Sequence, residues 1–599
     1  MKRWMTRFYL LSIVFLFGLK TVYSQSEITF YLEDLPQKTF SKIGIRGNQS
    51  PLSWDKSIEL KKYKDKYSIT VEFPESEKVL EFKFVCFDTD DQPTWENVSN
   101  RTIENNVGVL ESRSSWNKEQ IVDIDSLALI SSDALLEDFK LIHTMVLEVH
   151  PGTYRYNTKE EIQRELETLE AKFSNPLTYG EAYLAISRLT AQLKCDHTKA
   201  GFNNQNKLVN SVIHYQRDKL PFTFRWIEDK MVVIYNASEN DQLSKGTVIK
   251  SINAIPVQEI RNSLLPFVGA DGATDGNRLS KLEVNGYDFR YNAFDIFYPL
   301  VFPVDSTLHL EIINLKGEFT QIEVSTLSRD ERSEILIHRY EEFPKNRDDM
   351  WDFKVVNDSI GILTINSFGL TGWKAMSLEY KAYLKSVFTL ISQQKVSHLI
   401  LDIRENTGGN DEMANELFTY LTEVNFQFNR EGRTRYTAFP ESLKPFVQTW
   451  GDNPWYFDLN PEEGKTKDGY YIFKENKKEG KPLGNEHLFK GKLYLISGSS
   501  NTSLAFYTAY KFRMQKLGLI VGQETGGNLN DINGGQILFL RLPNSKIEID
   551  FPVMGGFMTD PQPNTGVKPD LNIDYTIQDI ISSKDLETEA ILRIIKGSK

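Results

Sequence analysis

The stretch Tyr494-Leu-Ile-Ser-Gly-Ser-Ser-Asn-Thr-Ser503-Leu-Ala-Phe-Tyr507 predicts a strand, a turn and a helix in succession. The apolar run from Leu493 to Ile496 is typical of a buried strand. The pattern from Ser503 to Leu517 is that of a helix, and Gly518 ends it. A serine at such a corner lies beside the free N–H groups of a helix N-terminus. Ser503 is therefore a candidate nucleophile with an oxyanion hole beside it, although serine is also a favoured helix N-cap residue.

A second corner of this kind precedes the first, at Asp402-Ile-Arg-Glu-Asn-Thr-Gly-Gly-Asn410. It follows an apolar strand and leads into a predicted helix from Asp411 to Leu421. Paired glycines let backbone N–H groups approach a ligand closely, although they also occur in plain turns between a strand and a helix. Because the carboxyl ends of neighbouring strands line one crevice in such sheets, the candidate oxyanion donors are Gly408, Gly409 and Leu504.

The composition is that of a globular protein, with 40% hydrophobic and 25% charged residues in a chain of 599. A net charge of −12 argues against a nucleic-acid partner and against docking on anionic lipid. The two cysteines, Cys86 and Cys195, fall in different predicted domains, and we expect both to be buried thiols. The histidines and cysteines show no metal-ligand spacing, so we expect no metal and no cofactor.

The start of the chain has the pattern of a secretory signal peptide. A basic segment, Met1 to Arg7, precedes the apolar run Phe8 to Leu19, and Ser24 is a small residue at the expected cleavage point. No later segment approaches the about 20 apolar residues that a membrane-spanning helix needs. We therefore predict a signal peptide over residues 1–24 and an exported chain, periplasmic or secreted, without stable membrane insertion.

The rest of the chain divides by periodicity into four regions. Residues 26–120 alternate apolar and polar positions, which predicts a β-sandwich. Residues 126–205 have amphipathic helical patterns, and strand patterns return over 206–340. Strands and helices alternate over 350–595, which favours an α/β domain with a partly parallel sheet. The stretch 430–490 lacks clear periodicity, and we interpret it as an insertion over that domain.

Six motifs in the chain resemble, in order, those of the tail-specific and C-terminal-processing serine peptidases and their tricorn-core relatives. The resemblance covers roughly residues 130 to 575. It implies a helical cap segment, a PDZ-like domain over 206–340 and an α/β peptidase core of the ClpP/crotonase-like type. It also implies a peptide or protein substrate. The motifs are Asp138-Phe…His150-Pro-Gly-Thr-Tyr, Leu193-Lys-Cys-Asp-His-Thr, Lys245-Gly-Thr-Val-Ile-Lys-Ser-Ile-Asn-Ala-Ile-Pro-Val, Asp402-Ile-Arg-Glu-Asn-Thr-Gly-Gly, Gly522-Gln-Glu-Thr-Gly-Gly and Gly566-Val-Lys-Pro-Asp.

This resemblance places the nucleophile at Ser503 and leaves two possible origins for its base. In the tail-specific branch a lysine 25 residues after the serine is the base, but that position is Asn528 here, and asparagine cannot take a proton. The tricorn-like branch uses a histidine from an Asp-Gly-His-Thr element, and His197 matches it. An imidazole with a pKa near neutrality suits that role. The element here lacks the glycine before the histidine, and a structural histidine at a helix end is the alternative interpretation.

The acid that would orient His197 has two candidates. Relatives carry an acid shortly before the Gly-Val-x-Pro-Asp motif, which makes Asp560 the first candidate and Glu524 the second. The resulting hypothesis is an exported serine peptidase in which Ser503 attacks and His197 takes its proton. Two rival hypotheses stay open. One is a peptide- or glycan-binding protein of the same fold whose catalytic site has decayed, and the other is an esterase.

The N-terminal sandwich carries a resemblance of its own, to starch-binding carbohydrate modules. It rests on Ile45-Arg-Gly-Asn-Gln-Ser-Pro-Leu-Ser-Trp54 and on Trp95-Glu-Asn followed by Asn100-Arg101. Aromatic faces stack on sugar rings, so Trp54 and Trp95 are candidate glycan-binding residues. The alternative is that both are core or loop aromatics in a domain that serves as a spacer.

Overall fold

The computed structural model describes residues 25–597 except for 34, 36–39, 64–65, 75–78, 90–92, 97, 104–110, 117–126, 202–204, 286–291, 344–350, 358, 370–378, 425, 427, 450–454, 460–465, 467 and 474–483. The predicted signal peptide lies outside the described residues. The chain forms two compact units, Met1–Glu119 and Gln120–Lys599. In the described parts of both units, no helix combines the length and apolar content that crossing a membrane requires.

The first unit consists of two β-sheets, as the alternating pattern predicts. One sheet has the order β4-β5-β1-β9 and the other β3-β2-β6-β7, with β8 paired to β6. Alternate residues of β1, among them Ile28 and Phe30, are fully buried and pack with Phe82 of β6 in one hydrophobic core. The strands are β1 (Gln25–Leu32), β2 (Lys42–Gly47), β3 (Ile58–Glu59), β4 (Lys61–Tyr63), β5 (Lys66–Pro74), β6 (Leu80–Phe87), β7 (Pro93–Trp95), β8 (Arg101–Ile103) and β9 (Glu111–Ser114).

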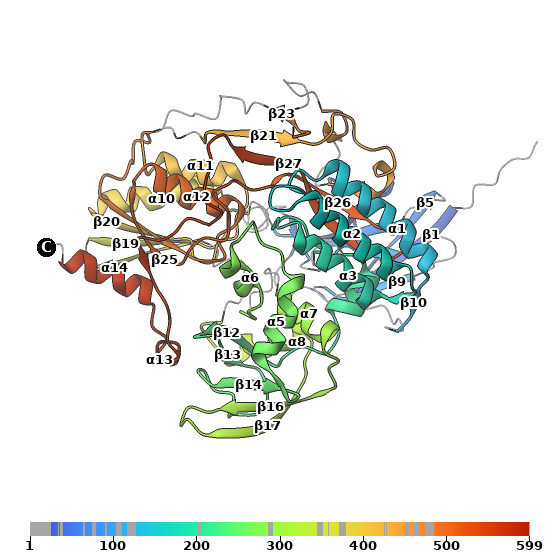
Figure 1. The fold of residues 1–599 in the computed structure, drawn as a ribbon, viewed down its shortest axis with the longest axis horizontal. Coiled ribbons are helices and arrows are strands. Elements are labelled where there is room, and N and C mark those ends of the chain that lie inside the picture. The colour runs from blue at the N-terminus through green and yellow to red at the C-terminus, as the bar shows by residue number, and fades with distance from the viewer. Residues whose placement is uncertain are drawn as a thin grey trace, which may run out of the picture. The chain divides into compact units, whose positions relative to one another are not determined.

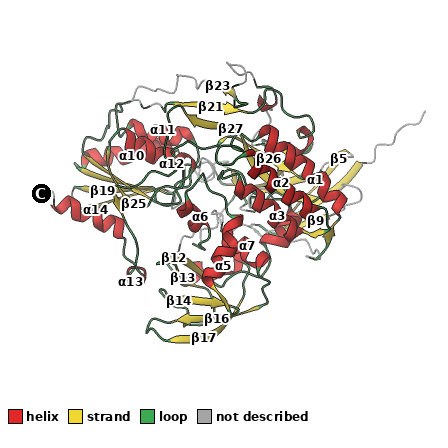
Figure 2. Cartoon of the chain, viewed as in Figure 1, coloured by secondary structure: helices red, strands yellow, loops and turns green. Residues whose placement is uncertain are grey.

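Three helices open the second unit and lie side by side (Figure 2). They are α1 (Ser132–Thr144), which continues as a π-helix over Met145–Val149, α2 (Lys159–Phe173) and α3 (Tyr179–Gln192). Capping boxes begin α2 and α3, because a threonine and a glutamate three residues later satisfy each other's backbone N–H groups. The helices predicted from the amphipathic pattern of this region are thus confirmed.

An antiparallel sheet follows the helices, with the order β12-β13-β14-β16-β17 and β15 paired to β14. Its strands are β12 (Phe222–Ile227), β13 (Lys230–Asn236), β14 (Val248–Ile252), β15 (Ile255–Pro256), β16 (Thr307–Ile313) and β17 (Phe319–Ser325). The helices of this region are α4 (Lys207–Val209), α5 (Val257–Leu264), α6 (Asp275–Lys281), α7 (Ala293–Val301) and α8 (Arg329–Arg339). The return of strands and the short helix after Val257 agree with the sequence pattern.

The α/β part contains a six-stranded sheet of order β18-β19-β20-β24-β25-β28, in which only β18 is antiparallel to its neighbour. Helices α10, α11 and α12 cover one face and α14 packs on the other (Figure 1). The elements are β18 (Trp351–Asn357), β19 (Ile360–Ile365), α10 (Tyr380–Gln393), β20 (His398–Asp402), α11 (Asp411–Thr419), β24 (Lys492–Ser497), α12 (Ser503–Met514), β25 (Gly518–Gly522), β28 (Leu571–Asn572), α13 (Ile577–Ile581) and α14 (Leu586–Gly597).

The stretch 430–490 is not a mere insertion, and that interpretation was wrong. Its strands β21 (Arg430–Thr434), β22 (Val447–Gln448) and β23 (Tyr471–Phe473) join β26 (Gly535–Arg541) and β27 (Glu548–Met558) in a second sheet of order β22-β26-β27-β21-β23. These strands are short, and their three pairings are to strands distant in sequence or to each other across a loop, so local periodicity does not reveal them. The same sheet packs with α1–α3 in one hydrophobic core.

The loop after α3 is tied to this second sheet. Lys199 and Asp550 of β27 form an isolated antiparallel bridge, in which the amide of each donates to the carbonyl of the other at 3.2 and 2.9 Å. The Cys195-Asp-His-Thr198 element lies just before that bridge. The second sheet, to which β27 belongs, therefore fixes the loop that follows α3.

Candidate active site

Ser503 begins α12, at the corner after β24, in a left-handed backbone conformation with φ +49°. Such a conformation costs a residue other than glycine about 1–3 kcal/mol and occurs preferentially at functional sites. The N-cap residue is Thr502, so Ser503 does not serve as the helix cap. Among the described residues, the Ser503 hydroxyl has no hydrogen-bond partner. The side chain is thus available for chemistry rather than committed to the fold.

The Gly408-Gly409 loop lies directly against this corner. The two glycines have φ of +119° and +140°, a region that favours glycine. A Cβ on Gly408 would lie 2.7 Å from the Ser503 Cβ and 3.0 Å from the Leu504 nitrogen. A Cβ on Gly409 would lie 2.2 Å from the carbonyl carbon of Phe368. Both glycines are therefore required for the two corners to meet.

The three predicted oxyanion donors differ in their availability. The Gly408 amide donates to Asn406 Oδ1 at 2.8 Å and is already engaged within its own loop. In the described part of the chain, the amides of Gly409 and Leu504 have no acceptor. Gly409 is exposed, whereas Leu504 is the second residue of α12, where intrahelical acceptors are lacking. These two amides are the available pair for a developing negative charge.

Two buried asparagines hold the corners together, and both side chains are fully excluded from solvent. Asn501 Nδ2 donates to the carbonyls of Ile403 and Asn406, and Asn501 Oδ1 accepts from the Gly498 amide. Asn406 Nδ2 donates to the Ile365 carbonyl at the end of β19. Sequence reasoning missed both residues, because an asparagine in a turn carries no signal that separates a structural brace from an ordinary turn residue.

His197 lies in the loop after α3, beside the segment that precedes β26. A Cβ on Gly534 would lie 3.1 Å from its Cε1, so the ring packs on that glycine. Burial lowers the pKa of His197 to about 3, well below the neutral range that the sequence suggested. The helix ends at Gln192 with Leu193 as its C-cap, so His197 does not cap it. No hydrogen bond joins Ser503 and His197 among the described residues.

One segment, residues 526–534, contacts both α12 and His197. At its start, the amides of Gly526 and Gly527 donate to the Asn501 carbonyl at 2.9 and 3.1 Å. In its middle, Asp531 accepts a hydrogen bond from the hydroxyl of Tyr507, one turn after Ser503 on α12. At its end, Gly534 supports the His197 ring. Helix α12, which Ser503 begins, and the His197 ring are therefore both contacted by the same nine residues of chain.

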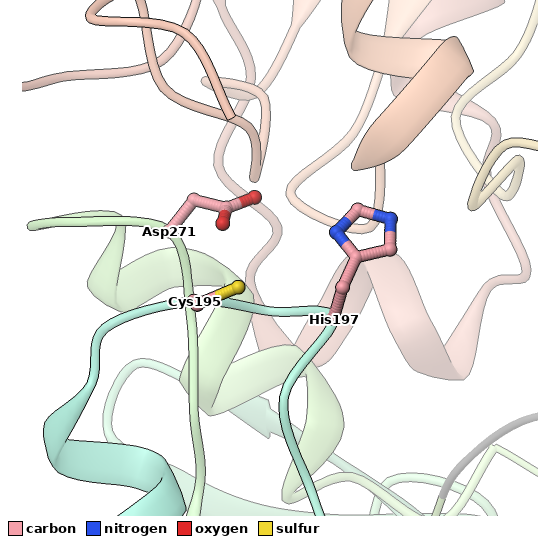
Figure 3. Close-up of side chains that lie close together, drawn as sticks. All are labelled: Cys195, His197 and Asp271. Atoms are coloured by element: carbon pink, nitrogen blue, oxygen red, sulfur yellow. The ribbon is translucent and has the colours of Figure 1, made fainter. Parts of the chain in front are cut away.

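His197 belongs to a cluster of three side chains, whose other members are Cys195 and Asp271. One donor atom from each of Cys195, His197 and Asp271 lies within 4.8 Å of the others. Figure 3 shows that the carboxylate of Asp271 faces Nδ1, the ring nitrogen next to the ring carbon that bears Cβ. Burial raises the pKa of Asp271 to about 7 and that of the Cys195 thiol to about 11. The donor set of sulfur, nitrogen and oxygen is one that Zn²⁺ can use, and the sequence spacing gave no sign of it.

The two acids that the sequence suggested lie in other environments. Asp560 is exposed, and its Oδ2 accepts from Asn429 Nδ2 at 2.8 Å. Glu524 Oε1 accepts from the Gly566 amide at 2.7 Å. In the described chain, neither carboxylate contacts His197 through a hydrogen bond or an ion pair.

Asn528, at the position of the tail-specific lysine, is a structural residue. It is fully buried, and its Nδ2 donates to the Asp271 carbonyl at 3.3 Å and to Asn564 Oδ1 at 2.7 Å. Its Oδ1 accepts from the Asn530 amide at 3.0 Å. The side chain thus anchors the backbone of Asp271 from the loop that contacts α12.

Comparisons with known proteins agree with this architecture. Residues 359–573 match the model of peptidase family S41, and residues 25–115 match that of the starch binding domain. Mature CPAF complexed with lactacystin shares 13% identity over 77% of this chain and 97% of that one, with a TM-score of 0.54. A serine-to-alanine mutant of CPAF shares 13% identity over 75% and 94%, with a TM-score of 0.50. No curated protein matches the chain significantly.

The fold and the family match together define the class of the second unit, a serine-type peptidase with an α/β core. The match of residues 359–573 to the model of peptidase family S41 confirms the resemblance to the tail-specific and C-terminal-processing peptidases. The resemblance of the sandwich to starch-binding modules is confirmed as well. At 13% identity, the likeness to CPAF shows a shared fold and nothing finer.

The asparagine brace leads to a first prediction. Asn501→Ala should lower the free energy of unfolding by about 1–3 kcal/mol, because it leaves buried backbone groups without partners. Urea unfolding followed by tryptophan fluorescence measures this loss. Asn175→Ala, at the exposed end of α2, is the matched control and should leave the midpoint unchanged. Equal midpoints for the two variants would contradict the brace.

Proposed function

We propose that this chain is an exported serine peptidase whose nucleophile is Ser503. The observation that carries the proposal is the conformation of Ser503: a strained serine begins a helix next to two amides, and among the described residues neither its hydroxyl nor these amides have hydrogen-bond partners. The match to peptidase family S41 supports peptide bonds as the target. Export rests on the signal-peptide pattern of residues 1–24 alone.

The reaction would proceed through an acyl-enzyme. Ser503 Oγ forms a bond to the carbonyl carbon of the substrate while His197 Nε2 takes the hydroxyl proton. The carbonyl oxygen becomes an oxyanion that accepts from the Gly409 and Leu504 amides. His197 then donates the proton to the leaving amine as the C–N bond breaks. Water attacks the ester in the same way, which releases the carboxylic acid and returns the proton to Ser503.

The sheet of the proposed PDZ-like region is where we expect the peptide to dock. The outer side of β12 pairs with Val284, whereas β17 forms the opposite edge of the sheet, and an extended peptide can add to such an edge through main-chain hydrogen bonds. We propose this role for the region 206–340, with the helical segment 126–205 delivering His197. The reaction as written requires no cofactor.

The nucleophile is tested by covalent labelling. Ser503→Ala should abolish both peptide hydrolysis and labelling by a fluorophosphonate, because only an activated serine reacts with that probe. Ser499→Ala and Ser500→Ala change serines on the same turn and should keep both properties. The readout is intact-protein mass spectrometry with peptide mapping of the label. A label on any serine other than Ser503 would refute the assignment, and an absence of labelling would favour the non-catalytic receptor.

The base is tested by His197→Ala, which should lower kcat/KM by about 10²–10⁴-fold. His338→Ala, on the exposed side of α8, is the matched control. Because burial lowers the pKa of His197, the ring stays neutral in mildly acidic solution. Protonation of His197 should therefore not reduce activity near the ordinary histidine value of 6.5, and a loss near pH 7 would instead report the buried Asp271 carboxylate, whose pKa is about 7. A normal rate for His197→Ala would rule out the histidine mechanism.

Glycan binding by the first unit is a second candidate function. The rings of Trp54 and Trp95 lie side by side, with centroids 6.2 Å apart and planes at 45°, and both are half-buried. The Arg46 guanidinium lies 5.0 Å from the Trp95 centroid and donates to the Trp54 carbonyl at 3.0 Å, which fixes the pair. Together with the starch binding domain match, this pair favours stacking on a sugar chain.

Retention on immobilised starch tests that function. Trp54→Ala and Trp95→Ala should each weaken retention of the full chain, because each removes one stacking face. Ser503→Ala serves as the control, since the peptidase site is not expected to contribute. If the unsubstituted chain is not retained on starch, or if both tryptophan variants are retained equally well, the first unit is a spacer.

A parallel assay separates the peptidase from the esterase. Matched peptide and ester substrates with the same acyl group are compared as kcat/KM. Hydrolysis of the peptide supports the proposal, whereas an enzyme that cleaves only the ester supports the rival.

A further inference from the structure

We infer that Asp271 is the acid that orients His197, an inference that rests on the proposed peptidase function. Asp271 acts through the histidine and is a positioning residue. Neither the motif order nor the spacing points to it, because it lies 74 residues after His197 and outside every motif of the resemblance. Its placement comes from the loop between α5 and α6, which brings it to the His197 turn.

Two buried polar atoms face each other across this cluster. His197 Nδ1 and Asp271 Oδ2 are both buried, and neither has a hydrogen-bond partner in the described chain. Figure 3 shows the carboxylate on the Nδ1 side of the ring, and the donor atoms lie within 4.8 Å. A buried polar atom without a partner is costly, and a small rotation of the Asp271 side chain would satisfy both atoms with one hydrogen bond. Catalytic hydrogen bonds are often long in the absence of substrate.

The Asp271 carboxylate is anchored to the same turn that carries His197. Its Oδ1 accepts from the amide of Asp196, the residue before His197, at 3.0 Å. This leaves Oδ2 as the atom directed at the ring. The geometry therefore ties the acid and the base together through adjacent residues of one loop.

The backbone of Asp271 is held from two further directions. Thr274 Oγ1 donates to the Asp271 carbonyl at 2.9 Å, and Asn528 Nδ2 donates to the same carbonyl at 3.3 Å. Asn528 stands where the tail-specific branch has its lysine base. In this chain, the asparagine at that position supports the backbone of Asp271.

Asp196, the acid next to His197 in the sequence, has other partners. Asp196 forms an ion pair with Lys281 Nζ, and that ammonium also donates to the Gly269 carbonyl at 2.8 Å. Asp560 and Glu524 have the partners described above. Asp271 is thus the carboxylate in direct reach of Nδ1 among the acids considered for this role.

The role of Asp271 is to set the tautomer of His197. A carboxylate that accepts from Nδ1–H places the proton on that nitrogen, which leaves the Nε2 lone pair free for the Ser503 hydroxyl. When Nε2 takes the proton, the imidazolium is adjacent to a negative charge. Because the ring nitrogen Nδ1 is buried, the charged ring needs a nearby carboxylate in order to form. The Nδ1 proton stays on the histidine throughout.

The first test reads the hydrogen bond without any turnover. Proton NMR of the full chain carrying Ser503→Ala should show a strongly deshielded Nδ1 proton. That resonance should disappear when His197→Gln or Asp271→Asn is added, and should persist with Asp560→Asn or Glu524→Gln. Asp271→Asn keeps the Oδ1 acceptor for the Asp196 amide, so the loop is preserved. A resonance that survives Asp271→Asn would overturn the inference.

The second test is kinetic. Asp271→Asn should lower kcat by about 10²–10⁴-fold, with the acid limb of the kcat/KM profile shifted to lower pH because the charged ring loses its counter-charge. Asp271→Glu should restore part of the rate. Asp560→Asn and Glu524→Gln should retain the rate of the unsubstituted chain. A loss with Asp560→Asn or Glu524→Gln but not with Asp271→Asn would overturn the inference.

Failure of this inference and failure of the proposed function are distinguishable. Fluorophosphonate labelling of Ser503 in the unsubstituted chain establishes the peptidase site independently of Asp271. If Ser503 is labelled and Asp271→Asn has a normal rate and pH profile, only the role of Asp271 is wrong. If activity is abolished by a chelator and restored by Zn²⁺, the cluster holds a metal and the orienting role of Asp271 is likewise wrong.

Discussion

The candidate active site depends on the close contact between the Gly408-Gly409 loop and Ser503. The two corners follow β20 and β24, which are neighbours in the sheet. A Cβ at either glycine would collide with neighbouring atoms. The buried asparagines beneath the corners fix their spacing through backbone carbonyls, so the geometry does not rely on flexible side chains. The strained backbone conformation of Ser503 persists because these surrounding contacts hold it in place.

The histidine is supplied by a different part of the chain, and the second β-sheet brings it into place. Strand β27 bridges to the loop that carries His197, and residues 526–534 run from α12 to the His197 ring. This arrangement spreads the site over segments that are hundreds of residues apart. It also explains why Cys195 and Asp271 are buried and His197 is half-buried, since they lie beside packed layers rather than on an exposed loop.

The sequence predicted the local parts of the structure well. The strand–turn–helix at Ser503, the Gly-Gly corner and helices α1 to α3 follow from periodicity and turn chemistry, which are local properties. Strands β21 to β23 were missed because they are short and stabilised by distant partners. Asp271, Asn406 and Asn501 were missed because a single polar residue reveals its role only through contacts that the fold creates. The pKa of His197 was misjudged because burial cannot be read from the motif.

The most direct measurement of the central claim is a crystal structure of the chain with a peptidyl phosphonate bound covalently. The account predicts an adduct on Ser503 Oγ whose phosphonyl oxygen accepts from the Gly409 and Leu504 amides at about 2.7–3.1 Å, with His197 Nε2 beside the leaving-group position. An adduct on another serine, or an oxygen directed away from these two amides, would contradict it.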